Sequence, residues 1–271
     1  CDLTGSGDLE IVLGTSEDKA TISVIEAGAS GSVDHTSDTV DNLSPSVLGP
    51  NQHAGVCLPD VTGDGVAELL SSSRYGLSPT FNNSAYILTG PLTEASYFGA
   101  LPSYQSGPNK GLNQFAATDT NGDGQDDLLV SLTGGPGWYE GGEGIVLSTS
   151  GYDIQVTGFG GYDSYRTVQP IGDLDGDGYD DIAIGESDVS TTDSSGTNTA
   201  AGRVRIFLGG TAGLETPSGS AASSASDAAL TIDGADAFGA LGSQIAGMDV
   251  NGDGDIDLLV PLESGWLLLD H

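Results

Sequence analysis

Five acidic segments of the sequence carry oxygen-bearing side chains at alternate positions. The richest, DLDGDGYDD at 173–181, has Asp at its positions 1, 3, 5 and 9 and Gly at positions 4 and 6. Alternating carboxylates on a loop that Gly bends tightly, with a backbone carbonyl at position 7, supply the roughly six to eight hard oxygen ligands that Ca²⁺ prefers. Mg²⁺ would require a smaller octahedral site. These residue types at this spacing therefore predict calcium binding.

The same pattern occurs in all five segments, and positions 1, 3, 5, 7 and 9 of each are the candidate metal ligands. In chain order these residues are Asp2, Thr4, Ser6, Asp8 and Glu10; Asp60, Thr62, Asp64, Val66 and Glu68; Asp119, Asn121, Asp123, Gln125 and Asp127; Asp173, Asp175, Asp177, Tyr179 and Asp181; Asp249, Asn251, Asp253, Asp255 and Asp257.

The five segments differ in ligand charge. At positions 1, 3, 5 and 9 the first copy has two carboxylates, Asp2 and Glu10, where the copy at 173–181 has four. Because calcium affinity follows ligand charge, we expect three strong sites at 119–127, 173–181 and 249–257, a moderate site at 60–68 and a weak first site. Two unit charges 4 Å apart interact by about 4 kcal/mol at an effective dielectric of 20, so converging carboxylates need a cation or a proton.

The flanking sequence distinguishes these loops from other calcium motifs. An EF-hand or dockerin loop needs an acidic ligand at position 12 and a following helix. Position 12 here is Val130 or Val260, inside a β-rich apolar run. The loops are therefore expected to be hairpin tips between two strands of one sheet.

The loops start 54 to 76 residues apart, so the chain is a repeat array. In each repeat a short segment precedes the loop and an apolar run such as 127–132 follows it. A third run such as 144–150 and a fourth such as 229–234 complete the unit. We predict an all-β fold, a β-propeller of about five four-stranded blades, because radial packing buries both faces of each sheet. A single domain over 1–271 would hold the approximate repeats 1–43, 44–97, 98–157, 158–232 and 233–271.

Two Ser-rich segments interrupt this pattern. The longest interval contains 211–229, whose Ser and Ala content is typical of an exposed loop without a function of its own, and 186–202 has a similar composition.

The overall charge limits the partners. The 39 acidic residues outnumber six basic ones and give a net charge of −33, which excludes nucleic acid and anionic membrane surfaces as favourable partners. No apolar stretch is long enough for membrane insertion. Cys1 and Cys57 can form one disulfide, and Cys1 is alternatively a site of lipid anchoring, the less favoured reading.

Phe-Gly dipeptides accompany the loops in FGALGSQIAGMDVNGDGDIDLLV (238–260) and YFGALPSYQSG (97–107), with a looser match at 159–185. With these motifs the chain resembles the FG-GAP repeats of the integrin α-subunit head and its bacterial relatives. The resemblance implies that each calcium loop joins the innermost strand of a blade to the second. The sequence departs from the family at 51–60, NQHAGVCLPD, where Phe-Gly is expected. Integrin heads also have seven blades rather than five.

Applied to this chain, the resemblance implies incomplete terminal blades. The first repeat begins in its loop without an inner strand, and the last lacks its outer strand. Because exposed strand edges invite pairing, additional chain or a neighbouring subunit is expected to complete them.

For ligand binding, the resemblance favours the rim opposite the calcium loops. Its candidate residues are Arg74, Tyr75, Tyr104, Trp138, Tyr139, Tyr162 and Tyr165. Aromatic side chains of this kind suit protein interfaces and also stack on sugar rings.

The leading functional prediction is an extracellular or cell-surface adhesion or recognition module for a protein or glycan, stabilised by Ca²⁺. One alternative is a structural subunit of a surface assembly or filament. The other is a calcium-dependent polysaccharide lyase, with Arg74, Lys110 and Arg166 as candidate basic residues. Nucleophile-elbow, zincin and phosphate-loop motifs are absent from the sequence, which favours a protein that is not an enzyme.

Overall fold

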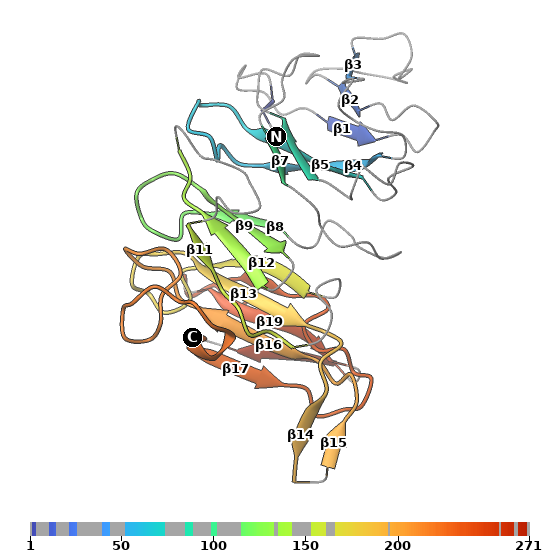
Figure 1. Ribbon diagram of the computed structural model, residues 1–271, viewed down its shortest axis with the longest axis vertical. Helices are drawn as coiled ribbons and strands as arrows, with labels where there is room; N and C mark the ends of the chain where they lie inside the picture. Colours follow the sequence, from blue (N-terminus) through green and yellow to red (C-terminus); the bar gives the residue numbers. More distant parts are fainter. Residues whose placement is uncertain are drawn as a thin grey trace. The chain divides into compact units, whose positions relative to one another are not determined.

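The computed structural model is all-β, with several antiparallel sheets, as the sequence predicts (Figure 1). Among the described residues, the one helical element is the 3₁₀ helix η2 (Ala225–Asp227), and no helix is long and apolar enough to cross a membrane. The described residues are 2–3, 11–14, 22–25, 40–43, 52–73, 85–88, 99–101, 115–132, 135–142, 153–160, 166–194, 196–254, 256–262 and 265–269.

The chain divides into two compact units, and the first comprises Cys1–Leu112 with Gly141–Gly151. It contains a three-stranded sheet of order β1-β2-β3 and a four-stranded sheet of order β4-β5-β6-β7. Cys57, in β4, is disulfide-bonded. The strands are β1 (Ile11–Gly14), β2 (Ile22–Ile25), β3 (Val40–Leu43), β4 (Gln52–Leu58), β5 (Glu68–Ser73), β6 (Ala85–Leu88) and β7 (Gly99–Leu101).

The second unit comprises Asn113–Glu140 with Tyr152–His271. Its sheets have the orders β11-β10-β9-β8, β12-β13-β16-β17 and β18-β19-β20, and β14 and β15 form a separate hairpin. The strands are β8 (Phe115–Thr118), β9 (Asp127–Leu132), β10 (Gly135–Tyr139), β11 (Ile154–Gln155), β12 (Arg166–Gly172), β13 (Asp181–Glu186), β14 (Thr191–Asp193), β15 (Gly196–Asn198), β16 (Arg203–Phe207), β17 (Leu230–Asp233), β18 (Ala246–Met248), β19 (Asp257–Leu262) and β20 (Gly265–Leu269).

The β12–β17 sheet lies at the centre of the second unit and is covered on both faces. All six residues of β13, DIAIGE, are buried. Its register places Ile182 and Ile184 on the face of Val168, and Ala183 on the opposite face. Because both faces are buried, apolar residues occupy both alternating sets of positions. The central residues of β13, IAIG at 182–185, therefore form a continuous apolar run.

One core cluster lies on each face of this central sheet. On one face Val168, Ile182 and Phe207 pack with Leu129 and Trp138 of the β8–β11 sheet. On the other, a second cluster joins the central sheet to the β18–β20 sheet; it comprises Ile171, Ala183, Val204, Ile206, Leu241, Ile245, Leu258 and Val260. Hydrophobic contact between neighbouring sheets thus holds this unit together.

The segment 211–229 differs from its prediction as an exposed loop. Leu214 and Ala222 are fully buried and belong to the core cluster that contains Trp138. Hydrogen bonds within the segment, such as Ala222 N to Leu214 O at 2.7 Å, fold it back on itself. The few apolar residues among its Ser residues therefore anchor the segment, which composition alone does not reveal.

The third strand of the β8–β11 sheet is also not the predicted one. β10 is formed by GPGWY, directly after β9, and pairs Trp138 with Leu129. The predicted run at 144–150 lies outside the described residues. Gly and Pro weaken a strand prediction, but the contacts of Trp138 in the core favour this pairing.

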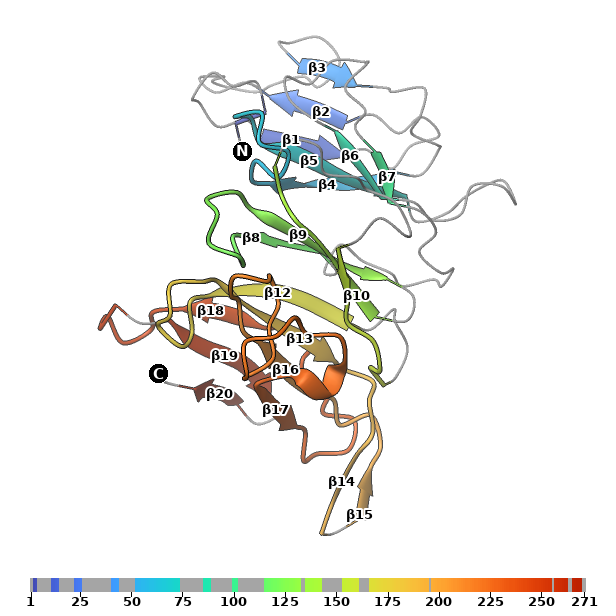
Figure 2. The ribbon, with the colours of Figure 1, turned by 60° about the vertical axis from the view of Figure 1, so that its left-hand side comes forward.

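The last sheet, β18–β20, ends at an exposed strand (Figure 2). Trp266 and Leu268 share a face of β20 and are 63% and 43% exposed. Both this sheet and β1–β3 have three strands among the described residues. Whether the chain forms one domain, and how many blades it has, stay predictions.

Candidate metal centres

Four of the five acidic loops lie within the described residues, apart from Asp255, and each joins the first two strands of its repeat. The loops 60–68, 119–127, 173–181 and 249–257 connect β4 to β5, β8 to β9, β12 to β13 and β18 to β19. The acid at position 9 is the first residue of the second strand in every case. The prediction that these loops are hairpin tips is thus confirmed for all four.

The Asp at position 1 organises each loop by accepting backbone hydrogen bonds. Asp173 Oδ1 accepts from Gly176 N at 2.8 Å and Asp177 N at 3.0 Å, and its Oδ2 accepts from Gly178 N at 2.9 Å. Asp60 and Asp119 accept the equivalent three bonds at 2.7–3.1 Å. Asp249 accepts two, from Gly252 N and Gly254 N. The loop backbone is therefore wrapped around one carboxylate, to which its amides donate.

The glycines at positions 4 and 6 allow this wrapping. All eight have φ between +72° and +100°, in the left-handed region that side chains disfavour. The pattern GxG inside each loop is thus explained by backbone conformation.

The acid at position 9 is buried beneath the loop. Glu68, Asp127, Asp181 and Asp257 are at most 1% exposed. Glu68 Oε2 accepts from Val61 N at 2.8 Å, and Asp181 Oδ2 accepts from Leu174 N at the same distance. The position-9 acid therefore ties the start of the loop to the second strand.

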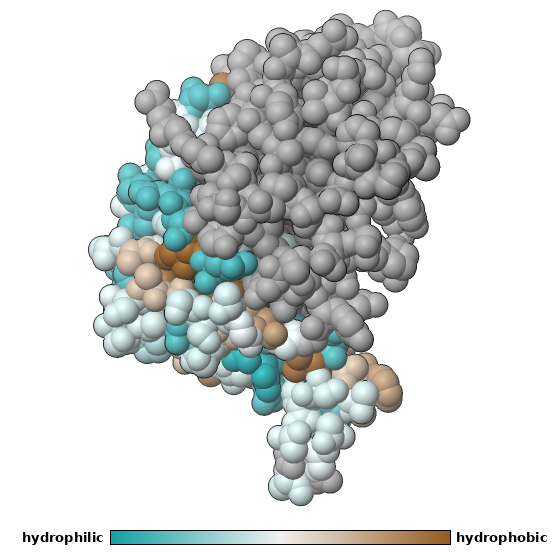
Figure 3. Space-filling model, in the orientation of Figure 1, coloured by the Kyte–Doolittle hydropathy of each residue, from teal (hydrophilic) through white to brown (hydrophobic). Residues whose placement is uncertain are grey.

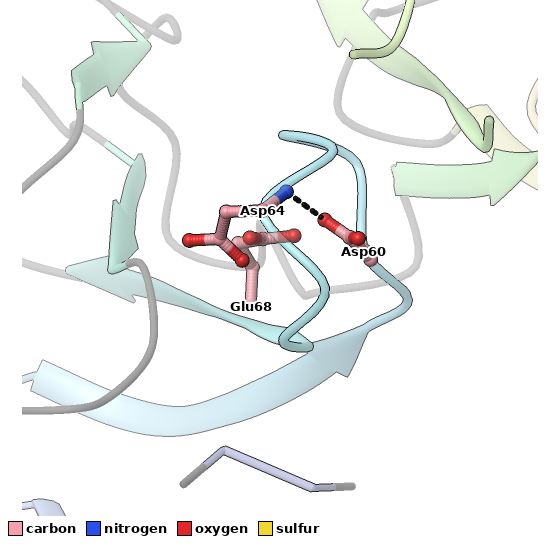
Figure 4. Close-up of side chains that lie close together, drawn as sticks. All are labelled: Asp60, Asp64 and Glu68. Atoms are coloured by element: carbon pink, nitrogen blue, oxygen red, sulfur yellow. Dashed lines mark hydrogen bonds between the residues drawn. The ribbon is translucent and has the colours of Figure 1, made fainter. Parts of the chain in front are cut away.

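Three acids of one loop converge closely enough for a shared cation. Asp60, Asp64 and Glu68 offer oxygen atoms within 4.8 Å of one another, and Figure 4 shows their side chains directed toward a common point. In the loop 173–181, Asp173, Asp175 and Asp177 form an equivalent group. Carboxylate oxygens at this spacing are the donors that a hard divalent cation takes.

Burial is the main cause that raises the pKa values of three loop acids. The pKa of Glu68 is raised to about 7, first by burial and then by the neighbouring carboxylates of Asp60 and Asp64, against two opposing hydrogen bonds. Burial likewise raises the pKa of Asp181 to about 6. The pKa of Asp175 is raised by burial and then by Asp177. A bound cation would reverse this by stabilising the charged carboxylates.

A buried carboxylate oxygen in the loop 249–257 is placed to bind a cation or to accept a further hydrogen bond. Asp257 is 1% exposed, its Oδ2 accepts from Val250 N at 2.9 Å, and its Oδ1 has no hydrogen-bond partner among the described residues. The equivalent Oδ1 of Asp181 accepts from Gly209 N at 2.8 Å. An unpaired buried carboxylate oxygen is costly, so the donor set of this loop suits a positive partner.

In the loops 119–127 and 249–257 an Asn replaces the acid at position 3. Asn121 and Asn251 each donate their Nδ2 to the carboxylate at position 5, Asp123 or Asp253, at 3.3 and 2.8 Å. Asn121 Oδ1 accepts from Asp123 N, and Asn251 Oδ1 accepts from Asp253 N. These side chains therefore present an amide oxygen and a carboxylate at the loop tip.

Contacts between neighbouring loops were not evident from the sequence. Tyr179, predicted as a carbonyl ligand, packs its ring on Gly122, where an added Cβ would lie 2.6 Å from Tyr179 Cε1. Thr118 donates its hydroxyl to Asp180, and Gly210 N donates to Thr120 O at 2.8 Å. The loop 119–127 is thus braced by the repeat that follows it. The signal in the sequence was the aromatic residue at position 7.

Two of the predicted ligand-contacting aromatics are core residues instead. Trp138 and Tyr139 are 4% and 0% exposed, and Trp138 donates its Nε1 to Thr120 Oγ1 at 2.8 Å. Their prediction as surface residues is wrong, because β10 lies inside the sheet and its side chains meet the core. Arg166 is the first residue of β12. The remaining candidates lie outside the described residues: Arg74, Tyr75, Tyr104, Lys110, Tyr162, Tyr165, Thr4, Ser6, Asp8, Glu10 and Asp255.

Two solved structures resemble the fold at low sequence identity. One concerns specific recognition of non-reducing terminal N-acetylglucosamine by a lectin from Agrocybe aegerita; it has a TM-score of 0.49 and 14% identity, over 98% of this chain and 61% of the lectin. The other is the V. cholerae biofilm matrix protein Bap1, with a TM-score of 0.31 and 17% identity, over 77% of this chain and 36% of that protein. The chain thus spans less than two thirds of either protein. No curated protein is significantly similar to the sequence.

A family model gives the more specific result. The FG-GAP repeat model matches residues 170–207. The matched segment contains the loop 173–181 and the strands β13 and β16 that follow it. Residues 170–207 are therefore similar to an FG-GAP repeat.

Proposed function

We propose that this chain is an extracellular β-propeller, stabilised by calcium, that recognises a protein or a glycan. The observation that carries the proposal is the repetition of one loop geometry. In four loops an Asp at position 1 accepts the amides of two Gly residues, and a buried acid at position 9 accepts the amide of position 2. A cation site in each loop best explains why all four loops carry clustered acids despite the repulsion between their carboxylates.

Calcium would be held by side chains at positions 1, 3, 5 and 9 and by the carbonyl at position 7. In the loop 173–181 these would be Asp173, Asp175, Asp177, Asp181 and the backbone of Tyr179. An ion bound there would supply positive charge between the carboxylates that follow the first strand and the carboxylate that begins the second strand. The residues themselves already fix the loop backbone, so binding would need little reorganisation.

The difference between the two ends of the strands in each repeat supports a recognition role. The loops between first and second strands carry the acids, whereas the opposite ends of the strands carry connections of variable length and sequence. Variable loops on a rigid scaffold are where binding surfaces usually lie. The similarity of 170–207 to an FG-GAP repeat is compatible with this arrangement. Sites of modest affinity would be filled outside the cell, where calcium-binding modules work at about 10⁻⁴ to 10⁻³ M.

The proposal is tested by thermal unfolding of the full chain in excess Ca²⁺ and in chelator. Each site saturated at 100 times its Kd stabilises the fold by about 2.7 kcal/mol, so Ca²⁺ should raise the Tm by several degrees. Asp177→Asn keeps the Oδ1 that accepts from Tyr179 N at 3.0 Å but removes one charge, and should reduce the increase.

Asp236→Asn is the matched control, because it removes an exposed carboxylate that lies outside every acidic loop. It should leave the calcium-dependent increase unchanged. Equal Tm values with and without Ca²⁺ would contradict the proposal. Assembly into a surface filament and turnover of an acidic polysaccharide stay predictions of the sequence alone.

A further inference from the structure

The turn at 236–239 presents an aromatic side chain to solvent. Gly239 N donates to Asp236 O at 3.0 Å, which closes a β-turn with Phe238 as its third residue. Phe238 is 71% exposed, more than any other large apolar side chain of the described residues. Phe238 belongs to one of the repeated Phe-Gly pairs, but Phe159 of the preceding pair packs against Phe207, whereas the ring of Phe238 is left in solvent.

The backbone of this turn is also strained. Phe238 has φ +65°, a conformation that the third position of such turns usually gives to Gly or Asn. Among the described residues two other non-Gly residues have positive φ, Ala200 at +48° and Ala240 at +50°. All three lie together, because Ala240 N donates to Ala200 O at 3.3 Å and Phe238 N donates to Thr199 O at 2.8 Å. Clustered strain of this kind is characteristic of functional sites.

Neighbouring segments hold the turn in place. Leu241 N donates to Ala201 O and Gly234 N to Gly202 O, both at 2.9 Å. The hydroxyl of Thr191, in β14, donates to Gly234 O at 2.6 Å. Phe238 is thus presented from a fixed backbone beside the base of the β14–β15 hairpin, which reduces the entropy lost when a ligand binds.

The turn and the hairpin lie at the end of the sheet opposite the acidic loops. β13 starts at Asp181 in its loop and ends at Glu186, from which the chain enters the hairpin. β17 ends at Asp233, opposite Arg203, and the turn follows. Figure 2 shows β14 and β15 projecting beyond this end of the sheet. This is the end at which variable connections are expected to bind ligands.

Phe238 lies on an Ala-rich turn, beside a hairpin whose exposed residues are mostly small and polar. Asp236, two residues away on the same turn, is exposed. In Figure 3 the projecting hairpin is pale, as its small polar residues require. The exposed hydroxyl-bearing residues of the hairpin and its base are Ser190, Thr192, Ser194, Thr197 and Thr199.

We propose that Phe238, Asp236 and the adjoining hairpin form a binding surface for a neutral glycan; this rests on the proposed recognition function and assigns it a place and a ligand class. The aromatic ring would stack on the C–H face of a sugar ring. The carboxylate of Asp236 would accept hydrogen bonds from sugar hydroxyls, as charged acceptors do strongly. The hydroxyl groups of the hairpin supply both donors and acceptors.

The charges on the chain select against other ligands. A net charge of −33 and the carboxylate of Asp236 disfavour sulfated or uronic-acid sugars. A protein interface usually buries a cluster of aromatic or aliphatic anchors. Phe238 is instead a single exposed aromatic side chain, on a turn with Asp236 and next to a hairpin with exposed hydroxyl groups, a combination that suits a small polar ligand with an apolar face.

The test uses the full chain in Ca²⁺, labelled and applied to an array of defined neutral, amino and acidic oligosaccharides. Binding to neutral oligosaccharides should exceed binding to acidic ones. The Kd for the best neutral oligosaccharide is then measured by calorimetry for Phe238→Gly and Asp236→Asn. Each change should weaken binding at least about tenfold.

Phe238→Gly separates binding from folding. Gly favours φ +65°, so this variant should melt at or above the Tm of the parent while losing the glycan. Glu140→Gln is the control, because it removes an exposed carboxylate that belongs neither to an acidic loop nor to the Phe238 turn, and it should keep the glycan affinity.

Three outcomes would overturn the proposal. They are a folded, calcium-loaded chain that binds no neutral oligosaccharide, a preference for acidic oligosaccharides, and neutral-glycan binding that Phe238→Gly leaves intact. The third would still be compatible with a recognition module, whereas an unchanged Tm with and without Ca²⁺ would count against the calcium proposal instead. Loss of binding to a protein, but not to a glycan, on Phe238→Gly would assign the surface to a protein partner.

Discussion

At the scale of single residues, each loop depends on two acids with different roles. Asp173 is wrapped by backbone amides of its own loop, whereas Asp181 is buried and joins the loop to β13 and to Gly209. The sequence pattern predicts both residues as ligands but does not separate them. The distinction depends on burial, which the first residue of a strand acquires only when neighbouring sheets pack.

The raised pKa values predict how the metal-free chain responds to pH. The folded-state pKa of Glu68, about 7, lies above its ordinary value of 4.5, so the folded state binds the proton more tightly than the unfolded chain does. The stabilisation is complete below about pH 4.5 and is lost as the pH rises through 7. Asp181 behaves likewise between 3.8 and about 6.

We therefore expect the metal-free chain to have a larger free energy of unfolding at pH 5 than at pH 7.5, measured by urea denaturation. Glu68→Gln, which stays neutral, should make the free energy of unfolding depend less on pH. For the parent chain, saturating Ca²⁺ should raise the free energy of unfolding at pH 7.5 and so reduce its difference from the value at pH 5. A metal-free chain that is equally stable at both pH values would contradict this assignment.

At the scale of elements, the sequence predicts well what is local. The repeat of acidic loop and apolar run correctly places β5, β9, β13 and β19, because loop, Gly spacing and strand are contiguous in the chain. Contacts between repeats are less predictable. The burial of Leu214 in a Ser-rich segment, the choice of β10, and the packing of Tyr179 on Gly122 all depend on which sheets become neighbours.

Two matched Gly substitutions test the bracing between loops. Gly122 and Gly176 occupy position 4 of their loops with φ of +72° and +76°, so Ala should cause similar backbone strain in both. An added Cβ at Gly176 meets no atom within 4 Å, whereas at Gly122 it meets the ring of Tyr179. We expect Gly122→Ala to lower the free energy of unfolding by about 1 kcal/mol more than Gly176→Ala. Equal losses in urea denaturation would show that Tyr179 does not brace the loop.

At the scale of the whole molecule, the acidic loops combine two properties of the sequence. Nineteen of the 39 acidic residues fall in the five nine-residue loops, which are also the points where first and second strands meet. Divalent ions bound there would reduce the charge and tie strands together in every repeat. The Ser-rich hairpin and the Phe238 turn lie at the other ends of the strands, where ligand binding would not compete with the ions.

Counting bound ions tests this account most directly. Equilibrium dialysis of the full chain against Ca²⁺, with Mg²⁺ in excess as competitor, should yield at least three tightly bound Ca²⁺ ions per chain and a weaker further class. The Asp177→Asn chain should hold one tight ion fewer. A chain that binds less than one Ca²⁺ ion under these conditions would contradict the central claim.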